Sequence, residues 1–298
     1  MVGVVGSSPI APTKTQYPEK NTATGNSSVQ RLRQAVRPFF QTLRTASRMV
    51  RGKHRPNHVL RRRVQLGKLL AVEFNNQVRY GPFRGLKLPE QTRWGGGGDV
   101  GSMLLGLYEQ ELLQALQALP RTRSVLVDLG AANGYYGLGA LVNHLFDYSY
   151  CYERSPASRE ILRVASQDNG LAQRVSIQGA AEPGFWHSIS HPLSDCVVMV
   201  DIEGGEFDLL DEAFFAAFRQ SIVFVELHDW FYADGAERLA RLRERASRTF
   251  AITELTTSAR DLSAFSELSR LSDDDRWILC SEGRGRRMTW WRLEPRNS

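Results

Sequence analysis

Short apolar runs alternate with longer mixed stretches from Ser124 onward, and this pattern predicts alternating strands and helices. Runs rich in Val, Ile and Tyr are typical of buried strands, and the mixed stretches between them are typical of helices. We expect strands at Val125–Leu129, Tyr148–Glu153, Val175–Gln178, Cys196–Asp201 and Ile222–Leu227. Such alternation predicts an α/β fold with a parallel sheet and helices on both faces.

The end of the chain predicts further strands. The segments "FAITEL", "WILC" and "MTWWRL" are apolar enough for two or three more, and we expect the last pair to form an antiparallel hairpin across "SEGRGRR".

The first 120 residues differ in composition from the rest. Residues 1–28 are rich in Ser, Thr, Asn, Gly and Pro, which predicts a disordered tail. Residues 29–72 carry apolar residues at helical spacing among many basic ones, which predicts a basic helical segment. Residues 73–120 are expected to form a lead-in: a hairpin at a sheet edge over 73–94, a flexible "GGGG" joint, and a helix ending at Pro120. The main domain then covers 121–298.

The positive charge is concentrated near the N-terminus. Twelve Lys and Arg and no acidic residue lie between Ser27 and Val72, so the rest of the chain has 26 basic against 32 acidic residues, although the net charge is +6. One interpretation is that residues 29–68 contact an anionic membrane surface, and nucleic acid is a less favoured partner. The other is that these are solvated faces of helices that pack on the body.

The cysteines and the lack of long apolar runs indicate the cellular compartment of the protein. Cys151, Cys196 and Cys280 are odd in number and widely spaced, which favours neither disulfides nor a paired-cysteine metal site. No signal-peptide pattern opens the chain, and no apolar run approaches the ~18 residues of a membrane span. We expect a cytoplasmic protein, with peripheral attachment at the inner membrane surface as an extension of the basic segment.

The turn after the first strand, "DLGAANGYY", is the first place to look for a ligand. Ligands of open parallel sheets bind beyond the carboxyl ends of the strands, and small residues let a ligand approach the backbone. A dinucleotide fingerprint would need glycine at Ala132. An acidic residue, Asp128, stands two positions before Gly130.

This turn resembles motif I of the class I S-adenosylmethionine-dependent methyltransferases. The resemblance implies that Gly130 to Tyr135 hold the methionine portion, that Asp128 braces the loop, and that Glu153 accepts the ribose hydroxyls. Glu182 would lie near adenine, and Asp201 would face the cofactor from its strand tip. The expected cofactor-binding residues are Asp128, Gly130, Ala131, Asn133, Gly134, Tyr135, Glu153, Glu182 and Asp201.

Two further motifs narrow the resemblance to the FkbM family. "VVMVDIEGGEFDLL" resembles its D-x-E-G-x-E-x-x-L signature and "VFVELHDW" resembles its E-x-H, while "YGPFRGLKL" and "LLGLYEQELL" resemble its lead-in. The resemblance covers roughly Val78 to Leu255. It implies a Rossmann-like class I methyltransferase fold, with a mostly parallel seven-stranded sheet, an antiparallel terminal strand and helices on both faces. It also implies O-methylation of a hydroxyl on a glycan, glycolipid or secondary metabolite.

The candidate catalytic residues follow the fourth and fifth strands. We expect His228 to accept the acceptor's proton, because its pKa can be near neutrality, with Asp201 as its partner. Glu203 and Glu226 are further candidates, or they bond backbone amides and hold the pocket without titrating. These carboxylates could also hold Mg²⁺, which is the less favoured second cofactor.

Two other functions remain open. An RNA methyltransferase could use the basic arm, although the rest of the chain is acidic. A non-catalytic relative of the fold could dock on membranes or nucleic acid. For the favoured function, we expect valine at Gly130 to fill the space the cofactor needs and to leave the core largely intact.

Overall fold

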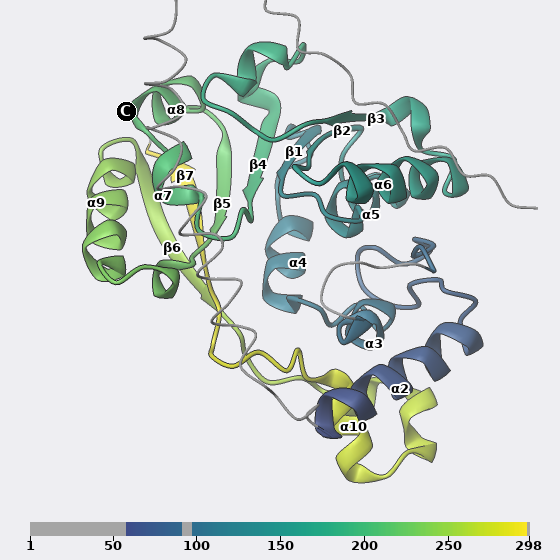
Figure 1. Cartoon of the computed structure of the whole chain (residues 1–298). Helices are drawn as coiled ribbons and strands as arrows, with labels where there is room; N and C mark the ends of the chain where they lie inside the picture. The colour runs from purple at the N-terminus through teal and green to yellow at the C-terminus, as the bar shows by residue number, and fades with distance from the viewer. Residues whose placement is uncertain (1–57, 91–96, 297–298) are drawn as a thin grey trace, which may run out of the picture. The chain divides into compact units, whose positions relative to one another are not determined.

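A computed structural model describes residues 58–90 and 97–296 of the chain (Figure 1). The predicted tail at 1–28, the basic segment before His58 and the first half of the glycine joint lie outside the described residues.

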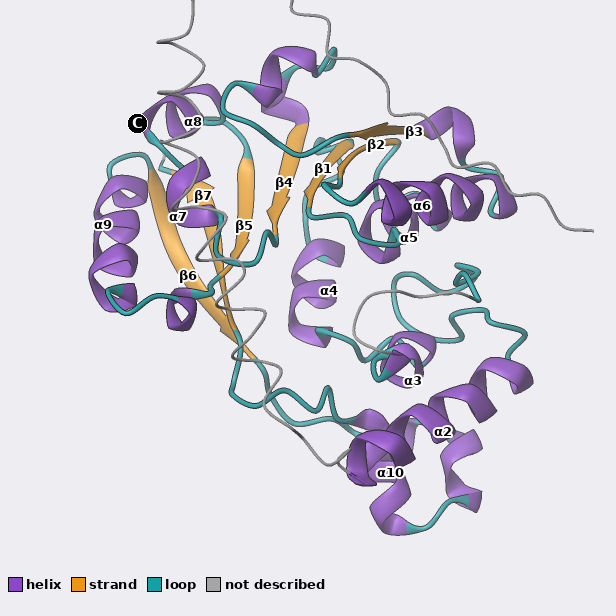
Figure 2. Cartoon of the chain, in the orientation of Figure 1, coloured by secondary structure: helices purple, strands orange, loops and turns teal. Residues whose placement is uncertain are grey.

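A single seven-stranded sheet forms the centre of the described chain, with the strand order β3-β2-β1-β4-β5-β7-β6 (Figure 2). Neighbours among the first five strands pair in parallel, whereas β7 pairs antiparallel with both β5 and β6. The strands are β1 (Val125–Leu129), β2 (Tyr148–Tyr152), β3 (Val175–Gln178), β4 (Cys196–Val200), β5 (Ile222–Glu226), β6 (Phe250–Thr256) and β7 (Thr289–Pro295). The predicted Rossmann-like fold is confirmed, including the antiparallel strand at the end of the chain.

The central strands are apolar throughout because both faces of the sheet are covered. Every residue of β1, β4 and β5 is buried. Leu126 joins one hydrophobic cluster and Val127 joins the other, because successive side chains point to opposite faces. Helices α4 (Gln110–Gln117), α5 (Tyr135–Val142) and α6 (Pro156–Asp168) contribute to the first cluster, and α7 (Glu206–Leu209), α8 (Glu212–Ala217) and α9 (Gly235–Ser247) to the second.

The predicted helix ending at Pro120 is wrong: two helices replace it, α3 (Val100–Leu104) and α4. The break between them contains two left-handed residues, Gly106 at φ 67° and Glu109 at φ 48°. A Cβ at Gly106 would lie 2.4 Å from the carbonyl oxygen of Tyr80, so the lead-in passes too close for any side chain there. Because of this break, Tyr108 and Glu109 lie between the two helices and belong to neither.

The hairpin predicted over 73–94 reverses the chain as expected, but its predicted place at the edge of the sheet is wrong. Its described residues, up to Glu90, form turns with one isolated bridge between Gln77 and Lys87, outside the sheet. Apolar side chains of this segment, such as Phe83, are instead buried in the core that covers one face of the sheet. Burial against helices therefore replaces pairing with a strand edge.

The "WILC" segment is helical, which corrects the predicted strand. It ends α10 (Asp273–Cys280), whose first turn is capped by Ser272 and carries three aspartates, a typical helix start. The antiparallel pair therefore forms between β6 and β7, and residues 257–288 make a long connection between them. The short 3-10 helices are η2 (Ala172–Arg174), η3 (Phe185–Ser188), η4 (Leu193–Asp195), η5 (Asp229–Phe231), η6 (Leu262–Ala264) and η7 (Ser266–Arg270).

This connection packs against α2 (His58–Glu73), the described part of the basic segment (Figure 1). The Arg62 guanidinium donates two hydrogen bonds to Asp275, at 2.8 and 2.7 Å. Arg63 is buried, and its guanidinium lies 3.7 Å from the Asp99 carboxylate. These two arginines thus serve packing within the chain, while a membrane contact through 29–68 stays a prediction. No helix within 58–90 and 97–296 is long and apolar enough to cross a membrane.

Candidate active site

The turn after β1 is fixed by backbone contacts to its two neighbouring strands. The amides of Gly130 and Ala131 donate to the carbonyl of Tyr152, at 2.8 and 3.0 Å. On the other side, the amide of Asp201 donates to the carbonyl of Leu129 at 2.9 Å. Gly130 has φ +96°, and a Cβ there would lie 1.8 Å from the carbonyl oxygen of Asp201. Glycine is therefore required at this position by the fold itself.

Glu153 joins the tip of β2 to the same turn. Its carboxylate accepts the amide of Ala132 at 3.0 Å and the amide of Ser155 at 2.5 Å. Ala132 is left-handed, at φ 46°, although it is not glycine. The structure places Glu153 beside the loop, where the resemblance put it; its bond to ribose stays a prediction.

Asp128 lies beneath the loop. It is 3% exposed, and burial raises the pKa of its carboxyl to about 7 despite a hydrogen bond from the amide of Gly137. That bond joins β1 to the first turn of α5, so the side chain faces the helix. Its predicted role of bracing the loop stays a prediction.

The other residues predicted to bind the cofactor differ in their burial and contacts. Gly134 precedes α5 at φ +90°, where a Cβ would lie 2.3 Å from a methyl group of Leu162. The ring of Tyr135 is buried and packs edge-on against Phe83, with centroids 5.2 Å apart, so only its backbone borders the turn. Asn133 is half-buried in the turn. Glu182 is exposed after β3, and no described residue bonds its carboxylate.

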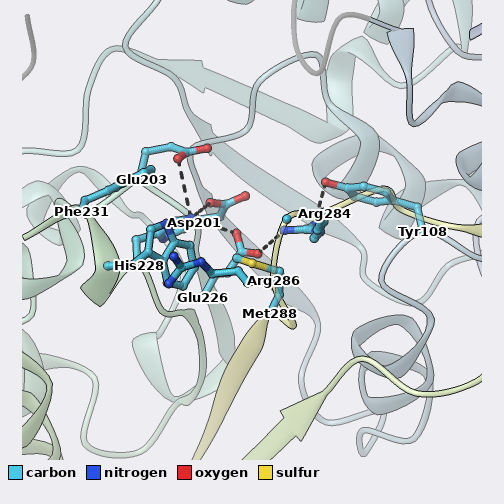
Figure 3. A pocket seen from close by; sticks show the side chains of 11 residues that line it. Tyr108, Asp201, Glu203, Glu226, His228, Phe231, Arg284, Arg286 and Met288 are labelled. Carbon is cyan, nitrogen blue, oxygen red and sulfur yellow. Dashed lines mark hydrogen bonds and ion pairs between the residues drawn. The ribbon is translucent and has the colours of Figure 1, made fainter. Parts of the chain in front are cut away.

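A cavity of about 270 Å³ opens at the tips of β4 and β5 (Figure 3). All four predicted catalytic residues line it, so the structure brings them together. The full lining is Tyr108, Asp201, Glu203, Glu226, His228, Trp230, Phe231, Arg284, Gly285, Arg286 and Met288.

His228 lies among carboxylates. Its Nε2 atom is 3.4 Å from Glu226, 3.7 Å from Glu203 and 3.8 Å from Asp201. Burial disfavours the imidazolium, but the hydrogen bonds and charges of Glu206 and Glu226 outweigh it and raise the pKa of His228 to about 11. Glu206 and Glu226 therefore favour the imidazolium form of His228, which makes this residue a poorer proton acceptor than the sequence predicts.

Glu206 performs the amide-bonding role that was the alternative for Glu203 and Glu226. It is fully buried, and its two oxygens accept the amides of Gly204 and His228, both at 2.8 Å. Its carboxylate thereby ties the loop after β4 to the end of β5. Glu203 is instead left-handed, at φ 55°, and its side chain is 42% exposed at the cavity.

The Asp201 and Glu226 carboxyls have opposite pKa shifts. Burial and the neighbouring Glu226 raise the pKa of Asp201 well above its usual value. Burial acts in the same direction on Glu226, but the hydrogen bond of His228 and the charge of Arg284 outweigh it and lower that pKa to about 2. Asp201 therefore carries the more basic carboxylate of the two, and its Oδ1 has no hydrogen-bond partner among the described residues.

The sequence did not predict that Tyr108 and residues from 284–288 line the cavity. Arg284 donates to Glu226 at 2.7 Å and to Glu282 at 2.9 Å, and it also bonds Glu109. The sequence predicts only a hairpin connection for the "SEGRGRR" stretch. Its position directly before β7, the strand that pairs with β5, is the signal that could have placed it near Glu226.

A metal is an alternative use of this cluster. Ligand atoms of Asp201, Glu203 and His228 all lie within 4.8 Å of one another. Mg²⁺ prefers oxygen ligands in octahedral geometry, whereas a mixed set with imidazole suits transition metals better. Mg²⁺ thus stays a less favoured prediction.

Comparisons with known proteins add little to this geometry. No family model and no curated protein matches the chain, so membership of the FkbM family stays a prediction. Among solved structures, the chain is similar to the Bacillus subtilis m1A22 tRNA methyltransferase TrmK, at 11% identity over 62% of this chain and 65% of that one, with a TM-score of 0.41. The match thus spans less than two thirds of the TrmK chain.

Two further structures match at a similar level. The TYW2 of M. jannaschii, in complex with AdoMet, has 14% identity over 64% of this chain and 77% of its own, with a TM-score of 0.39. The Geobacter metallireducens precorrin-6y C5,15-methyltransferase has 11% identity over 70% and 95%, with a TM-score of 0.43. We take the fold from the strand order and not from these matches.

Proposed function

We propose that the protein is an S-adenosylmethionine-dependent methyltransferase that acts on a hydroxyl group. The observation that carries this proposal is the position of Asp201. Its backbone lies against Leu129 and Gly130 of the predicted cofactor turn, while its carboxyl group lines the acidic cavity. The two half-sites thus adjoin, and methyl transfer needs a donor and an acceptor held in line.

The residues of the turn suit this cofactor. The backbone of Gly130 to Gly134 and the carboxylate of Glu153 would hold it, with Asp201 on the other side. The carboxyl groups of Glu153 and Asp201 lie beside the turn, which favours a ligand with a cationic sulfonium. Ala132 stands where a dinucleotide fingerprint needs glycine. When bound, S-adenosylmethionine supplies an electrophilic methyl group.

The chain's own residues then orient the acceptor and take its proton. Asp201 is the proton acceptor in this proposal, in its ionised form, because its carboxyl group lines the cavity beside the predicted cofactor turn, whereas Glu206 and Glu226 favour the imidazolium of His228. His228 balances the surrounding carboxylates. The Phe231 ring stacks on His228, with centroids 5.5 Å apart, and offers an apolar wall to the acceptor.

The acceptor class follows from the resemblance and from the cavity. Carboxylates can accept hydrogen bonds from hydroxyl groups, which fits a saccharide or a hydroxylated metabolite. The same carboxylates disfavour the phosphate backbone of RNA, so RNA methylation is the weaker alternative. A docking module is weaker still, because burying carboxylates around His228 costs stability and mere docking does not need it.

Product mass spectrometry tests the proposal. The full chain would be incubated with S-adenosylmethionine carrying a deuterated methyl group and a pool of saccharides, glycolipids, hydroxylated metabolites and RNA. We expect a labelled methyl ether. The Asp201→Asn variant should still bind the cofactor but lose transfer. A labelled base in RNA would establish the alternative, and a folded protein that binds no cofactor would remove both enzymatic functions.

A further inference from the structure

Arg286 lies at the rim of the acidic cavity and differs in its partners from the arginine two residues before it. Arg284 is bonded to three carboxylates, those of Glu109, Glu226 and Glu282. Arg286 is exposed and lines the same cavity, and no carboxylate among the described residues pairs with it. Its charge is therefore available to a ligand.

The contact that Arg286 does make is with an aromatic ring. Its guanidinium carbon lies 4.6 Å from the ring centroid of Trp230. Trp230 is held in turn against His228, with centroids 5.2 Å apart. A guanidinium that stacks by its face keeps the N–H donors on its edge, and those donors match two oxygens of one oxyanion. The ring thus gives Arg286 a partner at the cavity rim that leaves its N–H donors for a ligand.

The other charges of the cavity would orient such a ligand. The carboxylates of Glu203, Glu206 and Glu226 surround the His228 imidazolium. Together they carry more negative charge than it carries positive, so they would repel an anionic group placed there. An acceptor that carries both a hydroxyl and an oxyanion would therefore direct the oxyanion to Arg286 and the hydroxyl to Asp201. The charges of the cavity thus favour the orientation that the proposed transfer needs.

From this arrangement we propose that the acceptor is a hydroxyl compound with a carboxylate or phosphate group, such as a sugar acid or a sugar phosphate, and that Arg286 binds that group. The inference rests on the proposed function and names its substrate class. The cavity volume of about 270 Å³ lies just below the ~300–1,000 Å³ of ligand pockets, which suits one ring better than a polymer segment.

Paired sugar titrations test this inference on the full chain, with and without S-adenosylhomocysteine. The first pair is methyl β-D-glucopyranoside and its uronic acid, and the second is D-glucose and D-glucose 6-phosphate. Affinities would be measured by saturation-transfer NMR. We expect at least one acid to bind about tenfold more tightly than its neutral partner, with a preference that falls as salt is added. The pair that shows it identifies the oxyanion.

Two variants decide whether Arg286 is responsible. Arg286→Gln should remove the preference. Arg287→Gln is the matched control and should keep it, because Arg287 bonds Thr256 and Thr257 outside the cavity lining. Equal affinities within both pairs, no binding of either acid, or an unchanged preference in Arg286→Gln would overturn the inference. A separate calorimetric titration with S-adenosylmethionine reports on the methyltransferase proposal, so the two failures are distinguishable.

Discussion

The two halves of the site are built in different ways. The cofactor side is a turn between β1 and α5 whose positions are set by backbone hydrogen bonds and by glycine geometry at Gly130. The acceptor side is assembled from side chains far apart in sequence, such as Tyr108 and Arg284, whose side chains bond at 3.2 Å across 176 residues. The first half therefore depends on chain geometry, and the second depends on which groups carry charge.

The largest expected effect comes from Gly130→Val. Its Cβ would meet the carbonyl of Asp201, and φ is +96°, so we now expect the fold to lose at least about 3 kcal/mol of unfolding free energy. This corrects our sequence-based expectation of an intact core. Urea unfolding measures the loss. Gly179→Ala is the control, because a Cβ there has nothing within 4 Å; equal stability of the two variants would contradict the backbone account.

Arg284→Gln should break the acceptor side. It would remove a cation from three buried carboxylates. Glu282 keeps Arg260 and Glu226 keeps His228, but Glu109 loses its cation, and removing one partner of a buried ion pair costs about 3 kcal/mol. Thermal and urea unfolding would show it. Arg276→Gln, which removes a more exposed pair with Asp273, should cost under about 1 kcal/mol. A similar small loss for Arg284→Gln would show that its network contributes little.

Glu153→Ala and Glu182→Ala compare two of the carboxylates predicted on the cofactor side. Glu153 bonds the turn, so its loss should weaken S-adenosylmethionine binding by roughly 1–3 kcal/mol. Glu182→Ala removes an exposed carboxylate that bonds no described residue, and it should have a smaller effect. Calorimetry compares the two dissociation constants. A larger loss from Glu182→Ala would move the adenosine end toward β3.

The charge of His228 is tested by a pH slope of stability. Its folded pKa of about 11 exceeds the unfolded 6.5, so its stabilisation is fully present below pH 6.5 and is lost as pH rises toward 11. Wild type should therefore lose up to about 1.4 kcal/mol per pH unit more than His228→Gln over this range. Urea unfolding at several pH values measures both slopes. Parallel slopes would mean that the imidazole is neutral in the folded state.

The sequence predicted the sheet well because its strands are buried on both faces and read as plain apolar runs. The five parallel strands begin at the predicted residues and end at them or one residue earlier. The lead-in was less predictable, because the break near Glu109 arises from packing against Tyr80, which local pattern does not encode.

In the site, too, some residues could be placed from the sequence and others could not. The positions of Gly130, Glu153 and Asp201 could be predicted, since the carboxyl ends of adjacent parallel strands share one edge of the sheet. Arg284 could not be placed, because β7 enters the sheet beside β5 from the far end of the chain. The pKa of His228 could not be predicted either, because it depends on Glu206 and Glu226 lying within bonding distance in three dimensions.

The most direct test of the central claim is calorimetry of the full wild-type chain with S-adenosylmethionine and, separately, with NAD. The account predicts saturable binding of S-adenosylmethionine, weakened in Glu153→Ala, and no binding of NAD, because Ala132 replaces a fingerprint glycine. Binding of NAD, or no binding of S-adenosylmethionine by the folded protein, would contradict it.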